Sequence, residues 1–119
     1  TGLSAAGRPT RARPMPRRSR RTVRAVNPEA DFILVASMPG NAEWSGIRPD
    51  KFAEFRQILA ERAGPGVALA DVTGLWEELL KTKRYHDLTG NGVNHPNDFG
   101  HRLYAQTILA LLIEDYGAE

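Results

Sequence analysis

A histidine in a loop rich in glycine and asparagine is the residue of this chain best suited to chemistry. The loop spans residues 90–101 and reads GNGVNHPNDFGH, with the histidine at position 95. Pro96 restricts the backbone directly after it, and Asn97 and Asp98 are residue types that favour the start of a helix. A histidine between a stiff turn and a helix has a defined position, as a general base requires. His95 is therefore the candidate catalytic base; the alternative is a helix-capping loop whose histidine is merely exposed.

Neighbouring histidines and acids raise the alternative of a metal site. The residues concerned are His86, Asp87, His95, Asp98 and His101. Their spacing matches no familiar ligand pattern, and the chain has no cysteine, which excludes disulfides, thiol catalysis and cysteine-ligated zinc. We therefore expect no metal and no cofactor, and we interpret His101 as a helix residue that helps to shape the loop.

The charge of the chain is unevenly divided. Its 119 residues favour one domain, and hydrophobic and charged fractions of 41% and 25% are ordinary for a globular protein. No apolar run approaches the roughly 18 residues of a membrane span, so no membrane partner is expected. Residues 1–24 carry eight arginines and no acid, whereas the remaining 95 residues carry eight basic and fourteen acidic groups. The basic character of the chain is thus a property of its first residues.

Residues 1–21 are predicted to form a disordered, arginine-rich tail. They contain three prolines and almost no large apolar side chain, so they cannot offset the entropy of ordering. Three explanations compete: a nucleic-acid-binding arm, a targeting segment, and non-native sequence joined to a domain over residues 22–119. The third is favoured because the composition changes after Thr22. Nucleic acid is disfavoured, since the tail lacks lysine and interleaved aromatic residues, but a small basic nucleic-acid-binding protein remains the alternative function.

The order of elements after the tail predicts an α/β fold. Val23 and Val26 resemble the end of a helix, which Asn27-Pro28 breaks. Continuous apolar runs predict buried parallel strands, and helical patterns lie between and after them. The predicted strands cover residues 31–38 and 66–72, and the predicted helices cover about 50–63, 74–81 and 98–116. The right-handed crossover rule makes the strands parallel neighbours. A sheet of two strands is marginal alone, so the chain is interpreted as the second half of a doubly wound domain.

The loop over residues 41–49 follows the first predicted strand, at the end of the sheet where ligands bind in such folds. Asn41 and Trp44 are therefore candidates for a substrate pocket. The alternative for Trp44 is that it caps the core.

A longer segment carries a resemblance to a known family. Residues 87–105 read DLTGNGVNHPNDFGHRLYA. This closely resembles the last conserved block of the SGNH/GDSL hydrolases (GDSL-like lipases and acylhydrolases), in which a histidine–proline pair precedes the final helix and a glycine and a Tyr-Ala pair follow on it. The resemblance covers residues 22–115. It implies a partial flavodoxin-like, three-layer sandwich with parallel strands and flanking helices.

The family also implies a reaction. His95 would take the proton from a serine hydroxyl that attacks a carboxylic ester, and return it to the leaving alcohol. No cofactor is implied. The substrate would be a small-molecule or carbohydrate ester, such as an O-acetylated sugar, and Trp44 is a hint of sugar stacking.

Two departures from the family pattern bear on that expectation. The family's carboxylate lies three residues before the histidine, where this chain has Gly92; Asn91, Asn94 and Asp87 are the candidates to orient the ring, and a serine–histidine dyad is the other choice. The family's Gly-Asp-Ser motif is absent, and none of the four serines (Ser4, Ser19, Ser37, Ser45) stands in such a motif. We therefore expect a truncated enzyme, inactive alone, whose missing amino-terminal half is a partner. Its location in or outside the cell is left open.

Overall fold

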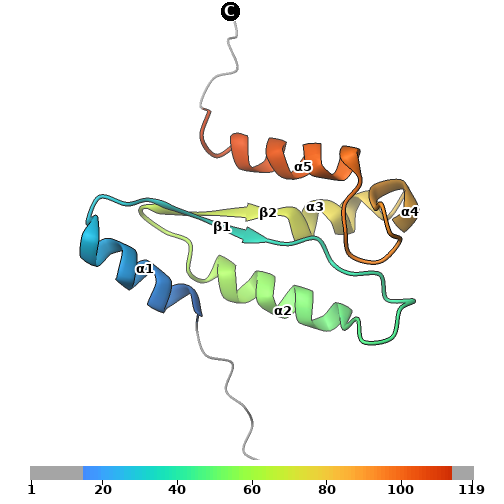
Figure 1. The fold of residues 1–119 in the computed structure, drawn as a ribbon, viewed down its shortest axis with the longest axis horizontal. Coiled ribbons are helices and arrows are strands. Elements are labelled where there is room, and N and C mark those ends of the chain that lie inside the picture. Colours follow the sequence, from blue (N-terminus) through green and yellow to red (C-terminus); the bar gives the residue numbers. More distant parts are fainter. Residues whose placement is uncertain (1–14, 114–119) are drawn as a thin grey trace, which may run out of the picture. The chain divides into compact units, whose positions relative to one another are not determined.

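The computed structural model describes residues 15–113. The chain divides after Ala30 into two units. Figure 1 shows the element order, which mixes helices with two strands: α1 (Met15–Val26), β1 (Phe32–Ala36), α2 (Pro49–Ala60), β2 (Val67–Asp71), α3 (Val72–Leu79), α4 (Tyr85–Leu88) and α5 (Asp98–Leu109). Within residues 15–113, no helix is long and apolar enough to cross a membrane.

The helix α1 belongs to the first unit. It begins at Met15, so residues 15–21, for which the sequence predicts disorder, are helical; residues 1–14 lie outside the described part. Arginine is a good helix former, and Pro16 falls in the first turn, where no helical N–H bond is lost. The helix ends at Val26, as predicted, just before Asn27-Pro28.

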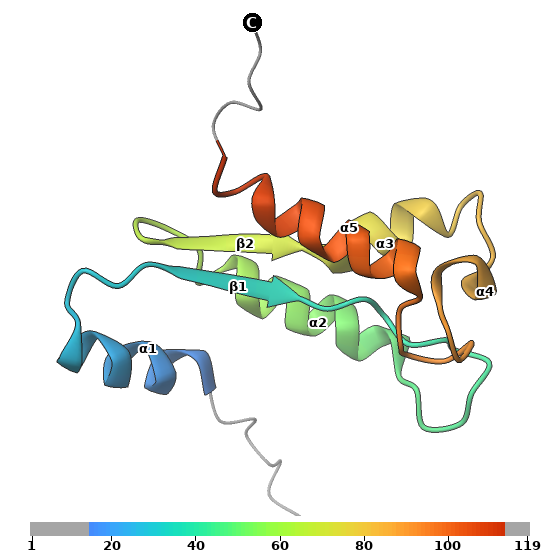
Figure 2. The same cartoon turned by 45° about the horizontal axis from the view of Figure 1, so that its top comes forward.

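A small parallel sheet lies at the centre of the second unit. β1 pairs with β2 in parallel, with Phe32 opposite Val67 and Ala36 opposite Asp71. This confirms the prediction of two parallel neighbours joined through a helix, and with it a small α/β fold. α2 and α5 lie on opposite sides of the sheet (Figures 1 and 2).

The core of this unit lies at the carboxyl ends of the strands, where α3, α4 and α5 meet. Its fully or nearly buried members are Met38, Val72, Trp76 and Leu88. Five partly buried side chains pack against them: Leu79, Leu80, Tyr85, Leu103 and Tyr104. Trp76 is fully buried, and its ring centroid lies 6.0 Å from that of Tyr104. The core therefore fixes the helices on either side of the loop that carries His95.

The strand β1 is less covered than the sequence predicts. A continuous apolar run is typical of a strand buried on both faces, but Val35 is 39% exposed and Phe32, Ile33 and Leu34 are half-buried. The prediction that this strand is buried on both faces is therefore wrong, because the helices within residues 31–113 leave part of β1 uncovered.

Candidate active site

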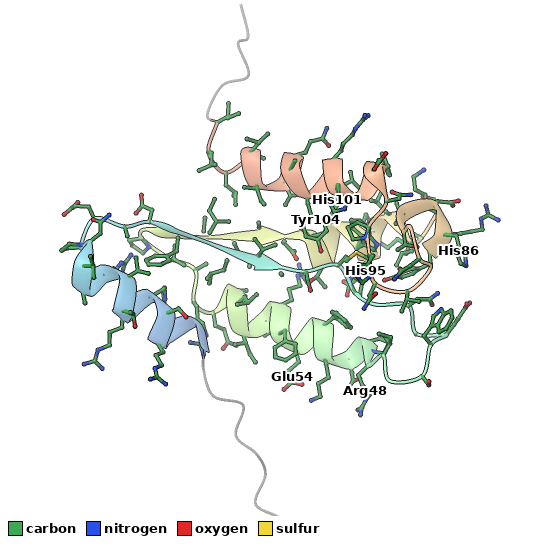
Figure 3. All side chains as sticks on the ribbon, viewed as in Figure 1. Arg48, Glu54, His86, His95, His101 and Tyr104 are labelled. Carbon is green, nitrogen blue, oxygen red and sulfur yellow. The ribbon has the colours of Figure 1, made fainter. Side chains whose placement is uncertain are left out.

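His95 lies in the loop between α4 and α5, on the side of the sheet where the two strands end (Figures 1 and 3). The loop is closed at its base by an isolated antiparallel bridge between Thr89 and Pro96. The Gly90 N–H donates to the His95 carbonyl at 2.9 Å, and the Asn97 N–H donates to the Leu88 carbonyl at 3.0 Å. These bonds hold His95 directly before α5.

Asn97 begins α5 as predicted. Its side-chain oxygen accepts from the Gly100 N–H at 2.9 Å, which satisfies one of the free donors in the first turn. Its Nδ2 donates to the Asp87 carbonyl at 2.9 Å, so the same side chain ties α5 to the end of α4. Gly100 is obligatory here, since a Cβ would lie 2.7 Å from the Leu88 carbonyl oxygen and 2.9 Å from the Trp76 ring.

Asn91 organises the interior of the loop. Its Oδ1 accepts three backbone N–H groups, from Val93 at 2.9 Å, Asn94 at 3.0 Å and His95 at 3.1 Å. The side chain thereby replaces a backbone carbonyl, as asparagine commonly does in turns. Gly92 supports the turn with a φ of 72°, which disfavours other residues. The Asn91 side-chain amide therefore fixes the backbone of residues 93–95 within the loop.

The imidazole of His95 is exposed and is held by one edge. Its Nδ1 lies 2.6 Å from the Asn94 Oδ1 and 2.9 Å from the Asn91 Nδ2. Within residues 31–113 no hydrogen bond engages Nε2. Both asparagines that the sequence singles out as orienting partners therefore contact the ring, and the other ring nitrogen is open to a reactant.

The third orienting candidate, Asp87, is engaged elsewhere. Its carboxylate accepts the Arg84 backbone N–H at 2.8 Å and the Arg84 guanidinium at 3.3 Å. These two hydrogen bonds, the backbone one first, hold the pKa of Asp87 below its ordinary value. The carboxylate caps α4 and forms no hydrogen bond with His95, because Arg84 draws it to the start of that helix.

Gly92 occupies the position where the family pattern has a carboxylate. A Cβ at Gly92 would lie 2.5 Å from Cε1 of His86 and 2.9 Å from its Nδ1. The site for a side chain at this position is thus filled by the His86 ring, which comes from α4. An acid at position 92 would point toward His86 rather than toward His95.

Asn41 joins the loop after β1 to the His95 loop. It is 5% exposed; its N–H donates to the Val93 carbonyl at 2.8 Å and its Nδ2 donates to the Gly92 carbonyl at 2.9 Å. Asn41 is therefore a tie between loops rather than an open pocket residue. Trp44 lies three residues further along the chain. Its backbone N–H donates to the Asn41 carbonyl at 3.1 Å, and the residue is 53% exposed. It does not cap the core, so its ring is available to a ligand.

Two hydroxyls that sequence reasoning missed hold the segment between β1 and Asn41. The Met38 N–H donates to the Tyr104 hydroxyl at 2.8 Å, and the Thr73 hydroxyl donates to the Ser37 carbonyl at 2.6 Å. Burial raises the pKa of Tyr104 above its ordinary value and raises that of Tyr85 to about 12. Both phenols therefore stay protonated at neutral pH. The sequence singled out Tyr104 as part of the Tyr-Ala pair at 104–105, but it did not indicate that the Tyr104 hydroxyl contacts Met38.

No serine hydroxyl within residues 31–113 hydrogen-bonds with His95. Ser37 and Ser45 are exposed, Ser19 lies in α1 of the first unit, and Ser4 lies outside the described residues. In the described part of the chain, no group of three or more histidines and acids has the geometry to hold a metal ion. The chemistry available here is thus that of one imidazole and its amide neighbours.

Comparison with known proteins adds no assignment. A scan against known protein families, a search of curated proteins and a search of solved structures found no match to this chain. A functional proposal therefore rests on His95 and the residues that surround it.

Proposed function

We propose that this chain is the histidine-bearing half of a carboxylic-ester hydrolase of the SGNH/GDSL type, with a partial flavodoxin-like sandwich fold. One observation carries the proposal. His95 is exposed beyond the carboxyl ends of two parallel strands, with Nδ1 hydrogen-bonded and Nε2 unengaged within residues 31–113. A general base needs this arrangement, because one ring edge fixes its position and the other exchanges the proton.

In the proposed reaction, Nε2 of His95 takes the proton of a serine hydroxyl as that oxygen bonds to the ester carbonyl carbon. The imidazolium then gives the proton to the departing alkoxide, which leaves as an alcohol, and the acyl group stays bonded to the serine oxygen. Water then loses a proton to Nε2 as its oxygen bonds to the acyl carbon. The bond between the acyl carbon and the serine oxygen breaks, which releases the acid, and the imidazolium returns the proton to the serine oxygen.

The nucleophile and the oxyanion donors are proposed to come from an amino-terminal half that pairs with this chain. The incomplete cover of the sheet supports this. β1 is apolar throughout and carries no lysine or proline, the usual protection of an edge strand, and Val35 is 39% exposed. A further parallel strand beside β1 would complete such a sheet.

The proposed substrate is a carbohydrate or other small carboxylic ester. The exposed Trp44 supports a sugar, because aromatic faces bind the apolar faces of sugar rings. Its loop is tied by Asn41 to residues 92 and 93, so a ring stacked on Trp44 would be held beside the loop of the proposed base.

The test is hydrolysis of p-nitrophenyl acetate by the full chain mixed with an amino-terminal half that carries a Gly-Asp-Ser motif, with co-elution as the check of assembly. We expect no serine-dependent hydrolysis from the chain alone. In the assembled complex, His95→Ala should lower the rate at least ~100-fold, the usual contribution of a general base. His101→Ala, an exposed histidine on α5, is the matched control and should keep the rate. An assembled complex whose activity survives His95→Ala would contradict the proposal.

One observation favours nucleic-acid binding as a second candidate function. Arg20, Arg21 and Arg24 recur at helical spacing in α1, and no acid accompanies them in that helix. A basic helix face neutralises phosphates, so the affinity should fall steeply with salt, with a slope of ~0.9 per phosphate contacted. Labelled duplex DNA titrated at two salt concentrations measures this. Arg21→Ala should reduce the slope and Arg48→Ala, outside α1, should not; a salt-independent or absent interaction excludes the candidate.

A further inference from the structure

Asn91 and Asn94 both contact the His95 ring, but the hydrogen bonds give them different roles. The Asn91 amide has one orientation, since its Oδ1 accepts three backbone N–H groups. Its Nδ2 therefore faces Asn94 and His95. An amide nitrogen has only protons to offer, so Asn91 can act toward either neighbour only as a donor.

That donor in turn orients Asn94. The Asn91 Nδ2 donates to the Asn94 Oδ1 at 3.1 Å, so oxygen, not nitrogen, is the Asn94 atom on this side. The same oxygen lies 2.6 Å from Nδ1 of His95. An oxygen acceptor this close to a ring nitrogen requires a proton between them, because otherwise two lone pairs would face each other.

The opposite tautomer is disfavoured by the same distances. If Nδ1 were bare, it could accept from the Asn91 Nδ2 at 2.9 Å, but the shorter contact with Asn94 would become a repulsion between lone pairs. The proton would then sit on Nε2, the nitrogen that no residue within 31–113 engages. Each tautomer leaves one unfavourable contact: the Asn91 Nδ2 at 2.9 Å when Nδ1 carries the proton, and the Asn94 Oδ1 at 2.6 Å when Nδ1 is bare. The shorter contact dominates, and it places the proton on Nδ1, while the Asn91 Nδ2 keeps its hydrogen bond to Asn94.

We propose that Asn94 is a positioning residue that holds neutral His95 with its proton on Nδ1 and with Nε2 unprotonated, and that Asn91 sets the orientation of Asn94. Two uncharged amides thereby orient the ring, a task that a carboxylate at the position of Gly92 performs in the family pattern. The tautomer follows from the hydrogen bonds alone; its significance for catalysis rests on the proposed function.

The tautomer can be read directly in the full chain labelled with ¹⁵N. Long-range ¹H–¹⁵N correlation spectra, at a pH where the ring is neutral, distinguish the proton-bearing ring nitrogen from the bare one. We expect the proton of His95 on Nδ1. In Asn94→Ala the acceptor is lost while the Asn91 Nδ2 remains as a donor, so the major form should switch to a proton on Nε2.

Two further variants separate this role from a structural one. Asn94→Asp keeps an oxygen acceptor and should restore the proton to Nδ1. Asn27→Asp makes the same change outside the His95 loop, where the side-chain oxygen accepts from the Glu29 N–H and aspartate keeps that acceptor, and should leave the tautomer as in the parent chain.

A parent chain with its proton on Nε2, or an Asn94→Ala variant that keeps it on Nδ1, would overturn the proposal. If Asn94→Ala loses its dispersed spectrum, the parent chain and Asn94→Asp still decide. No ester enters this experiment. A tautomer as expected, without hydrolysis by the assembled complex, would refute the proposed function and leave the positioning role intact.

Discussion

Restoring a carboxylate at position 92 is the change that the family pattern invites, and the structure predicts that it harms the loop. Gly92 has a φ of 72°, and a Cβ there would lie 2.5 Å from Cε1 of His86. The left-handed backbone at this position costs a residue with a side chain about 1–2 kcal/mol. Alanine also lowers the conformational entropy of the unfolded chain relative to glycine, which offsets about 0.4–1 kcal/mol of that cost. Displacing the His86 ring adds about 1 kcal/mol. Gly92→Ala should therefore destabilise the fold by about 2 kcal/mol.

The two contributions can be separated because the His86 ring is exposed and removable. In a chain that already carries His86→Ala, Gly92→Ala should lose only the backbone part, about 1 kcal/mol. Urea unfolding followed by tryptophan fluorescence measures all four chains, with the fully buried Trp76 as a reporter. The coupling between the two substitutions is then about 1 kcal/mol, which is larger than the error of such cycles.

Equal costs of Gly92→Ala in both backgrounds would refute the assignment of that space to His86. Gly92→Asp extends the test to function. Because its side chain would point toward His86, it should not raise the activity of the assembled complex; a gain in activity would show that an acid at position 92 reaches His95.

Other predictions follow from single contacts. Asn91→Ala removes the acceptor of three loop N–H groups and should cost about 1–3 kcal/mol in urea unfolding, whereas Asn91→Asp, which keeps an oxygen there, should cost less. Tyr104→Phe leaves the Met38 N–H without its acceptor and should cost about 1–2 kcal/mol by the same measurement. Burial raises the pKa of Asp71, but hydrogen bonds from Arg56 and from the third residue of α3 outweigh it, so the pKa is lowered. A lowered pKa in the folded state means that Asp71 stabilises the fold above its ordinary pKa and that this contribution is lost as the pH falls through the folded value. Stability between pH 6 and pH 2 should therefore drop less in Asp71→Asn than in the parent chain, and an unchanged pH dependence would contradict the role of this carboxylate.

Much of the fold could be predicted because its signals are local. Two apolar runs, the first ended by Pro39-Gly40 and the second preceded by Gly64-Pro65-Gly66, located both strands, and the crossover rule made them parallel. Asn97 was predicted as the cap of α5 because capping depends on residues only three apart. The last helix was predicted too long: α5 ends at Leu109, and the predicted residues 114–116 lie outside the described part.

What the sequence could not predict depends on contacts between distant residues. Asn41 bonds with the carbonyl of Gly92, 51 residues away, and no local pattern marks such a pair. The cover of β1 depends on which helices reach it, so an apolar run alone overestimated its burial. The engagement of Asp87 by Arg84, three residues earlier, was readable from spacing and would have removed Asp87 from the candidates to orient His95.

The measurement that bears most directly on His95 as a general base is the rate at which the serine of the assembled complex becomes acylated by p-nitrophenyl acetate, followed by mass spectrometry of the acyl-serine peptide. We expect acylation with the parent chain and a rate at least ~100-fold lower with His95→Ala. Equal rates of acylation with the two chains would contradict the account.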